Sequence, residues 1–214
     1  MSYAVTIDIV GSRSLHDRPA AQRAIDDALE FVDQDVPPLT AVRPTVGDEL
    51  QGVYAGLDDA LAATLILRLA LPDEVDCRFG LGAGDAGRVP SRRASEPELG
   101  ISEGSAWWAA RRAIERAHAL PASGVAGGRS WYEGPGAASV NAYLLTRDQI
   151  VSAMTGRARR LALGAWRGER QADLARREGV SQSAVSQMLG RSGGASLVAG
   201  LHLLRSGSSV DRDA

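Results

Sequence analysis

The chain of 214 residues contains no lysine, one cysteine and few aromatic residues, which make up 5% of the sequence. A single cysteine, Cys77, excludes a disulfide framework and is typical of a buried core thiol in the reducing cytoplasm. No apolar run approaches the ~20 residues that a membrane helix needs, so we expect no membrane span. The N-terminus lacks a basic patch followed by an apolar block, and we therefore expect no signal peptide and a cytoplasmic location.

Charge is distributed unevenly along the chain, although the net charge is only −2. Residues 1–146 contain 13 arginines and 20 acidic residues, whereas residues 147–214 contain 11 arginines and 6 acidic residues. The balance is therefore −7 in the first part and +5 in the second. The basic part is the better candidate for contact with nucleic acid, and we expect two domains, 1–146 and 147–214.

Hydrophobic periodicity predicts an α+β fold for residues 1–146. Strands are expected over residues 3–10, 39–46, 49–55 and 76–82, and helices over residues 17–36, 57–71 and 104–119. The order strand, helix, hairpin, helix, strand, helix is typical of a ferredoxin-like or palm-type sandwich. After residue 146 only helices are predicted, including one over residues 148–166 and a final one over residues 195–204.

The most specific pattern in the chain is RQADLARREGVSQSAVSQMLGR, residues 170–191. A helix-turn-helix needs a small residue in its first helix, a glycine in the turn and a β-branched residue under the second helix. Ala175, Gly179 and Val185 stand at this spacing. Gly179 can adopt the positive φ that ends the first helix, and Ser181 is a suitable N-cap for the second. The pattern predicts an all-α helix-turn-helix domain over residues 147–214.

The expected outer face of this motif carries groups that bind DNA. Amides and hydroxyls read base edges in the major groove, and arginines bind phosphates. The predicted DNA-binding residues are Arg170, Arg177, Ser181, Gln182, Ser183, Ser186, Gln187 and Arg191. One such module binds weakly, so we expect a homodimer on a palindromic site. The alternative is a helical bundle that only docks on the first domain.

A second group of candidates lies near the N-terminus, where a strand ends in Asp8 and is followed by Gly11, Ser12 and Arg13. Asp48 stands in the expected hairpin turn, which lies beside the first strand in a palm-type sheet. Two converging carboxylates repel each other unless a cation lies between them, and Mg²⁺ with a nucleotide phosphate fills this role. We expect Asp8 and Asp48 to bind Mg²⁺ and the glycine, serine and arginine to bind phosphate. Alternatively, Asp8 caps the next helix and Asp48 is only a turn residue.

The motifs DIVGSR, GDELQG, FGLGAGDAG and GSAWWAARRAIERA, in this order, resemble those of class III nucleotide cyclases, and GDEL resembles the hairpin of GGDEF diguanylate cyclases. Over nearly its whole length the chain is similar to the SatD family, which has DIVGSR and GDE-x-Q motifs and a C-terminal helix-turn-helix. The cyclase resemblance implies that the Ile9 carbonyl is a further metal ligand. It also implies a catalytic role for Arg112, or for Arg111 if the helix is offset. Trp108 and Pro44 stand where the cyclases have an asparagine and a base-reading lysine.

These features together predict a cytoplasmic transcriptional regulator that binds DNA through its C-terminal part. The cyclase-like part is expected to bind a nucleotide with Mg²⁺, to mediate dimerisation, or both. Because Trp108 and Pro44 replace residues used for catalysis and base selection, binding is favoured over rapid turnover. The alternatives are an active nucleotidyl cyclase or related phosphoryl-transfer enzyme with a regulatory helix-turn-helix, and a dimer scaffold without a ligand.

Overall fold

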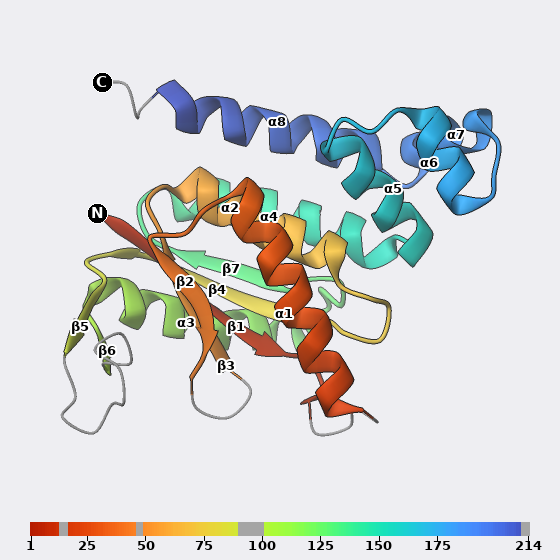
Figure 1. Ribbon diagram of the computed structural model, residues 1–214. Helices are drawn as coiled ribbons and strands as arrows, with labels where there is room; N and C mark the ends of the chain where they lie inside the picture. Colours follow the sequence, from red (N-terminus) through yellow and green to blue (C-terminus); the bar gives the residue numbers. More distant parts are fainter. Residues whose placement is uncertain (13–16, 46–48, 90–100, 211–214) are drawn as a thin grey trace.

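The computed structural model describes residues 1–12, 17–45, 49–89 and 101–210 (Figure 1). The strands are β1 (Ser2–Ile9), β2 (Thr40–Pro44), β3 (Glu49–Tyr54), β4 (Cys77–Gly84), β5 (Gly87–Val89), β6 (Ile101–Glu103) and β7 (Ser130–Glu133). The helices are α1 (Arg18–Asp35), α2 (Leu57–Ala70), α3 (Ser105–Ala119), α4 (Ala137–Ala153), α5 (Gly156–Trp166), α6 (Gln171–Glu178), α7 (Gln182–Arg191) and α8 (Gly194–Val210), with a short 3-10 helix, η3 (Pro121–Ser123). This mixed content confirms the predicted α+β class. None of the helices in the described ranges is long and apolar enough to cross a membrane.

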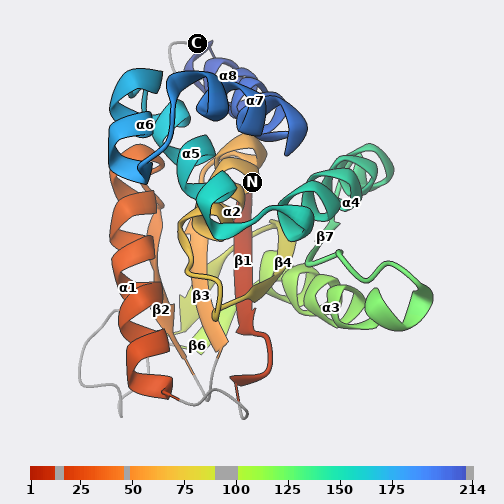
Figure 2. The ribbon, with the colours of Figure 1, turned by 90° about the vertical axis from the view of Figure 1, so that its right-hand side faces the viewer.

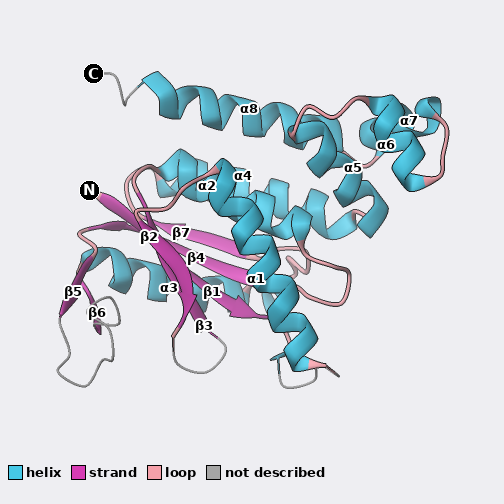
Figure 3. Ribbon diagram, viewed as in Figure 1, coloured by secondary structure: helices cyan, strands magenta, loops and turns pink. Residues whose placement is uncertain are grey.

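Five strands form one sheet in the order β2-β3-β1-β4-β7 (Figure 3). β1 lies in the middle and is antiparallel to both of its neighbours, β3 and β4. The hairpin of β2 and β3 continues the sheet on one side, and β7 pairs with β4 in parallel on the other. Strands β1 to β4 therefore follow the ferredoxin-like order that the sequence predicts.

Helices cover both faces of this sheet because successive side chains of β1 point to opposite sides (Figure 2). Val5 and Ile7 belong to the main hydrophobic cluster with residues of α1 and α2, whereas Ala4 packs in a second cluster with α3. Gly80 and Gly82 of β4 let α3 approach closely, since a Cβ atom at either would overlap backbone atoms of the helix. Asp8 is on the same side of β1 as Ala4, so α3 covers the face that carries Asp8.

The helices from α5 onward pack on the α2 side of the sheet, and α8 lies across α2 (Figure 1). Arg205 of α8 donates to Asp59 of α2, and the Arg167 guanidinium after α5 lies 3.2 Å from the ring centroid of Phe31 in α1. The main hydrophobic cluster continues from the sheet through α5, α6, α7 and α8. The expected boundary between residues 146 and 147 falls inside α4, and the division into two domains stays a prediction.

The single helix predicted over residues 148–166 is wrong, because two helices meet there. α4 begins already at Ala137 and ends at Ala153, and Met154 has an extended backbone with ψ of 139°. Thr155 then caps α5 by accepting a hydrogen bond from the Ala158 N–H at 3.3 Å. The final helix, predicted over residues 195–204, extends to Val210.

A buried network of charges joins α2, α4 and β7. The Oδ1 atom of Asp148 accepts hydrogen bonds from Arg68 at 3.1 Å and from Arg147 at 2.8 Å, and its Oδ2 atom accepts one from the Arg129 N–H at 2.8 Å. Arg147 also donates to the Ser130 hydroxyl at 2.6 Å. Burial alone would raise the pKa of Asp148, but the guanidiniums of Arg147 and Arg68 lower it below its ordinary value. The network fixes α4 against α2 and the sheet.

Candidate functional site

Asp8 lies near the end of β1, on the face of the sheet that α3 covers. The antiparallel registers place it opposite Glu49 of β3 and Arg78 of β4. Arg78 Nη1 donates to Asp8 Oδ2 at 3.3 Å, and His118 Nε2 of α3 lies 3.1 Å from the same oxygen. Asp8 does not cap the next helix, because the N-cap of α1 is Asp17. The structural alternative considered for Asp8 is therefore wrong.

Glu49 completes a compact group of charges around Asp8. Its Oε2 atom accepts from Arg111 Nη1 at 2.8 Å, and its Oε1 atom accepts from the Gln51 amide at 2.7 Å. Two carboxylates, those of Asp8 and Glu49, thus face the guanidiniums of Arg78 and Arg111. The carboxylate charges are compensated by side chains from β4 and α3.

The described residues contain only part of the predicted Mg²⁺ site. Among them, no group of three or more His, Cys, Asp or Glu side chains is arranged to hold a metal ion. Asp8 Oδ2 is engaged by an arginine and a histidine, and Ile9 is buried opposite Cys77 of β4. Asp48 and Arg13 lie outside the described residues. Mg²⁺ binding therefore stays a prediction that depends on Asp48.

The remaining residues predicted for this site have different surroundings in the structure. Gly11 follows β1 with φ of 65°, a conformation that favours glycine, and Ser12 is buried. Arg111 reaches Glu49, whereas Arg112 is exposed and makes no hydrogen bond or ion pair with any residue that the structure describes. Trp108, on the same helix, is 69% exposed. An arginine of α3 reaches the carboxylates, and it is the one given by the offset alternative.

Sequence reasoning missed Arg78 and His118. No motif connects these residues, because they are brought together by strand register and by the placement of α3. One signal was available in the sequence. Arg111 and His118 are seven residues apart and therefore lie on one side of a helix. That side of α3 faces the ends of β1 and β3.

The second candidate region is the pair α6 and α7, which are joined by residues 179–181. Gly179 ends α6 with φ of 66°, and its N–H bonds back to carbonyl groups of the last turn. Ser181 caps α7 by accepting a hydrogen bond from a backbone N–H three residues later, at 3.1 Å. Ala175 and Val185 are buried. The helix ends and the inner face have the features that the sequence pattern predicts.

The predicted base-reading side chains all lie on the exposed side of α7. These are Gln182, Ser183, Ser186 and Gln187. Among the predicted phosphate-binding residues, Arg177 donates to Glu169 at 2.6 Å. The side chains of Arg170 and Arg191 are exposed and make no hydrogen bond or ion pair within the described ranges. The two arginines therefore carry positive charge that no described side chain neutralises.

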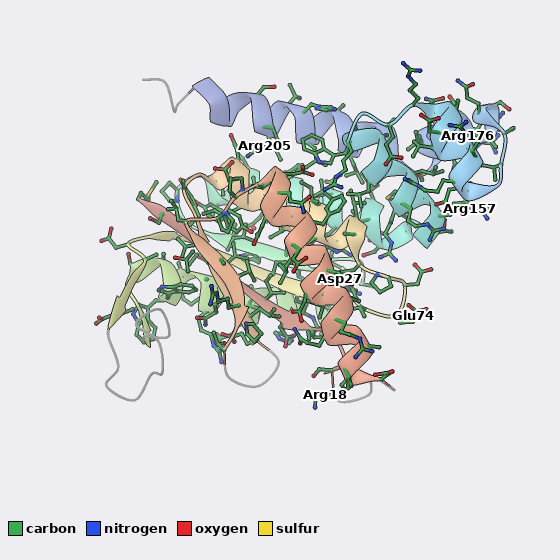
Figure 4. All side chains as sticks on the ribbon, in the orientation of Figure 1. Arg18, Asp27, Glu74, Arg157, Arg176 and Arg205 are labelled. Atoms are coloured by element: carbon green, nitrogen blue, oxygen red, sulfur yellow. The ribbon has the colours of Figure 1, made fainter. Side chains whose placement is uncertain are left out.

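Ion pairs connect α6 to α5, at the end of the molecule where Figure 4 labels Arg157 and Arg176. Glu178, the last residue of α6, accepts two hydrogen bonds from Arg160, at 2.9 and 2.7 Å. The hydrogen bonds from Arg160 lower the pKa of Glu178 below its ordinary value, and Arg157 lies 3.6 Å away on the same carboxylate. α6 is therefore held to α5 by charge as well as by packing.

Comparisons with known proteins give a family and two similar structures. The structure of the guanylyl cyclase Cya2 is 14% identical, covers 54% of this chain and 68% of its own, and has a TM-score of 0.35. That of the adenylyl cyclase CyaB from P. aeruginosa is 12% identical, covers 56% of this chain and 80% of its own, and has a TM-score of 0.36. A comparison with curated proteins finds no match. The model of the SatD family matches residues 3–195, and the chain therefore belongs to the SatD family.

Proposed function

We propose that this protein is a DNA-binding transcriptional regulator that reads DNA with α7. The observation that carries the proposal is the polar row formed by Gln182, Ser183, Ser186 and Gln187, exposed on a helix whose opposite side is buried. Gln182 and Ser186 are four residues apart, as are Ser183 and Gln187, so each pair lies on one side of the helix, and all four are exposed. Side-chain amides can bond bidentately to adenine, and hydroxyls can bond to several base edges.

Basic side chains flank this row and support the same proposal. Arg170 directly precedes α6 and Arg191 is the last residue of α7. Arg176 pairs with Asp173, but its side chain is 81% exposed. Because exposed ion pairs contribute little free energy, a phosphate can replace Asp173 as its partner at small cost. The arginines would position the helices on the DNA backbone, while the amides read the bases.

The direct test is selection of bound fragments from a random duplex library by the full chain, followed by fluorescence anisotropy on the enriched sequence. Gln182→Ala should cost about 1–3 kcal/mol on that sequence and relax the preference at one base pair. Its affinity for random DNA should not change. Gln34→Ala, which removes an exposed glutamine near the end of α1, is the matched control. Failure to enrich any sequence would contradict the proposal, as would an equal loss on both DNAs.

The phosphate contacts have their own test. Arg170→Ala and Arg191→Ala should each weaken binding to specific and random DNA alike. Each should also reduce the slope of log affinity against log salt concentration by about one. An unchanged slope would remove that arginine from the interface. We expect two chains per palindromic site, which the anisotropy titration also measures.

We propose as a second candidate that the end of β1 binds a nucleotide with Mg²⁺. It is favoured by the position of Asp8 opposite Glu49, three residues before the positive φ of Gly11. Binding would require Asp8 to exchange Arg78 and His118 for the ion. Thermal unfolding with nucleoside triphosphates tests this, since a ligand of the native state raises the melting temperature. A rise in melting temperature that persists without Mg²⁺ or in Asp8→Asn would contradict this proposal. If the rise needs both Mg²⁺ and Asp8, a product assay distinguishes binding from turnover.

A further inference from the structure

A cavity of about 520 Å³ lies between α1, α5 and the loop that joins α2 to β4. α1 lines it with Ala24, Asp27, Ala28 and Phe31, and α5 lines it with Gly156, Arg159, Arg160 and Leu163. Both sets have the spacing i, i+3, i+4, i+7, which is one side of a helix. Each helix therefore turns a whole side toward the cavity, which is open to solvent, and Ala70 of α2 and residues 71–74 of the loop line another side.

Small residues keep this space open. Ala24 and Ala28 leave the α1 side shallow, and a Cβ atom at Gly156 would stand 2.6 Å from the Asp73 carboxylate. The volume is in the range of roughly 300–1,000 Å³ that is usual for small-molecule pockets. The lining combines alanine, leucine, proline and phenylalanine with charged side chains, those of Asp27, Asp73, Glu74, Arg159 and Arg160.

The two arginines of the cavity already have partners. Arg159 donates to Asp73 at the cavity wall. Arg160 donates two hydrogen bonds to Glu178, at 2.9 and 2.7 Å. Their positive charges are therefore compensated inside the protein, and neither needs an anionic ligand.

Two carboxylates of the cavity remain without a partner. Asp27 of α1 and Glu74 of the α2–β4 loop are exposed, and neither makes a hydrogen bond or ion pair with any described residue. Figure 4 shows them on the two different elements that border the cavity. A space with both apolar and charged walls, in which the two arginines are paired and carboxylates on two sides are not, favours a ligand that is positively charged at two points.

We propose that this cavity binds an aliphatic diamine or polyamine. The ammonium groups of such a ligand would pair with Asp27 and Glu74, and charge-assisted hydrogen bonds of this kind are about twice as strong as neutral ones. Its methylene groups would pack on Phe31 and Leu163. An anion would be repelled by the two carboxylates, and an uncharged ligand would leave them unpaired. The inference does not depend on DNA binding, because it is tested on the chain alone.

The test is isothermal titration of the full chain with putrescine, cadaverine and spermidine, with 1,4-butanediol as the uncharged control. We expect saturable binding of at least one amine with a stoichiometry of one, and none of the diol. Absence of amine binding in the millimolar range would overturn the proposal. Equal binding of the diol would also overturn it, since the carboxylates would then play no part.

Variants locate the site. Asp27→Asn and Glu74→Gln should each raise the Kd by about tenfold or more, since each removes one charged partner. Glu30→Gln removes the same charge from α1 outside the cavity and should leave the Kd unchanged. Ala24→Leu should fill the cavity and abolish binding, whereas Ala138→Leu, at an exposed position of α4, should not. Equal losses in Glu30→Gln and Asp27→Asn would show general attraction to an acidic surface and overturn the proposal.

Discussion

Removing the carboxylate of Asp148 should cost more stability than removing any exposed acidic group. Asp148 is fully buried between the buried guanidiniums of Arg68 and Arg147. Asparagine could still accept one hydrogen bond, but it would leave Arg147 without its counter-charge and Arg68 with only Asp76, whose Oδ1 atom lies 3.7 Å away. Breaking a buried pair from one side costs about 3–5 kcal/mol, and we expect this loss for Asp148→Asn. For a chain of this length that corresponds to a fall in melting temperature of about 6–20 °C.

Equilibrium urea unfolding, followed by circular dichroism at neutral pH, measures this loss. Asp173→Asn is the matched control, because it removes an acidic partner of an arginine on the surface. It should change the free energy of unfolding by no more than about 1 kcal/mol. If Asp148→Asn loses equally little, the buried network does not stabilise the fold and the reasoning is refuted.

Acid should remove the difference between the original chain and Asp148→Asn. Burial acts to raise the pKa of Asp148, but Arg147 and Arg68 outweigh it, so the folded-state pKa is lower than the unfolded-state value. The stabilising contribution is therefore fully present above the unfolded-state pKa and is lost as the pH falls through the folded-state pKa. A gap in stability that stays constant through the acid range would contradict this assignment.

Three further predictions concern single positions. Gly179→Ala should destabilise the protein by about 1 kcal/mol, because a φ of 66° is unfavourable for alanine although the space is open. Gly190→Ala, inside α7, should instead stabilise the protein by up to about 1 kcal/mol. Thermal unfolding compares the two variants, and a change in melting temperature of the same sign in both would contradict the cap geometry. Gly82→Ala should destabilise strongly in the same assay, because its Cβ atom would overlap the α3 backbone, and a neutral effect would mean that α3 does not lie so close. Burial, with a smaller effect of Asp76, raises the pKa of Cys77 to about 12, so this thiol should react with thiol reagents only after unfolding, and rapid labelling of the native protein would be evidence against burial.

Local signals in the sequence predicted most of the elements, because caps and turns act over a few residues. Asp17 begins α1 by accepting from the Ala20 N–H at 2.8 Å, and Gly179 ends α6, both as their residue types indicate. The break between α4 and α5 was missed because apolar residues continue at helical spacing across Met154. Thr155, a good N-cap residue, was the available signal.

The surroundings of Asp8 could not be predicted from local signals. The end of a strand at Asp8 follows from hydrophobic periodicity, but its partners depend on the registers of β3 and β4 and on how close α3 lies. The charge balance of the sequence also did not reveal where the first two charged residues of the basic part lie. Arg147 and Asp148 marked the start of a basic part, yet both are buried, because each supplies a partner for the other.

Arg160 of α5 connects the cavity to the proposed DNA-binding helices. It lines the cavity and holds Glu178 at the end of α6. A ligand in the cavity can change DNA affinity only if it binds one arrangement of α5 and α6 better than another. Since its ammonium groups would pair with Asp27 and Glu74, the ligand need not break the Arg160–Glu178 pair. Such a ligand would therefore tend to stabilise the arrangement described, and DNA, if it needs that arrangement, would bind the ligand-bound protein more tightly.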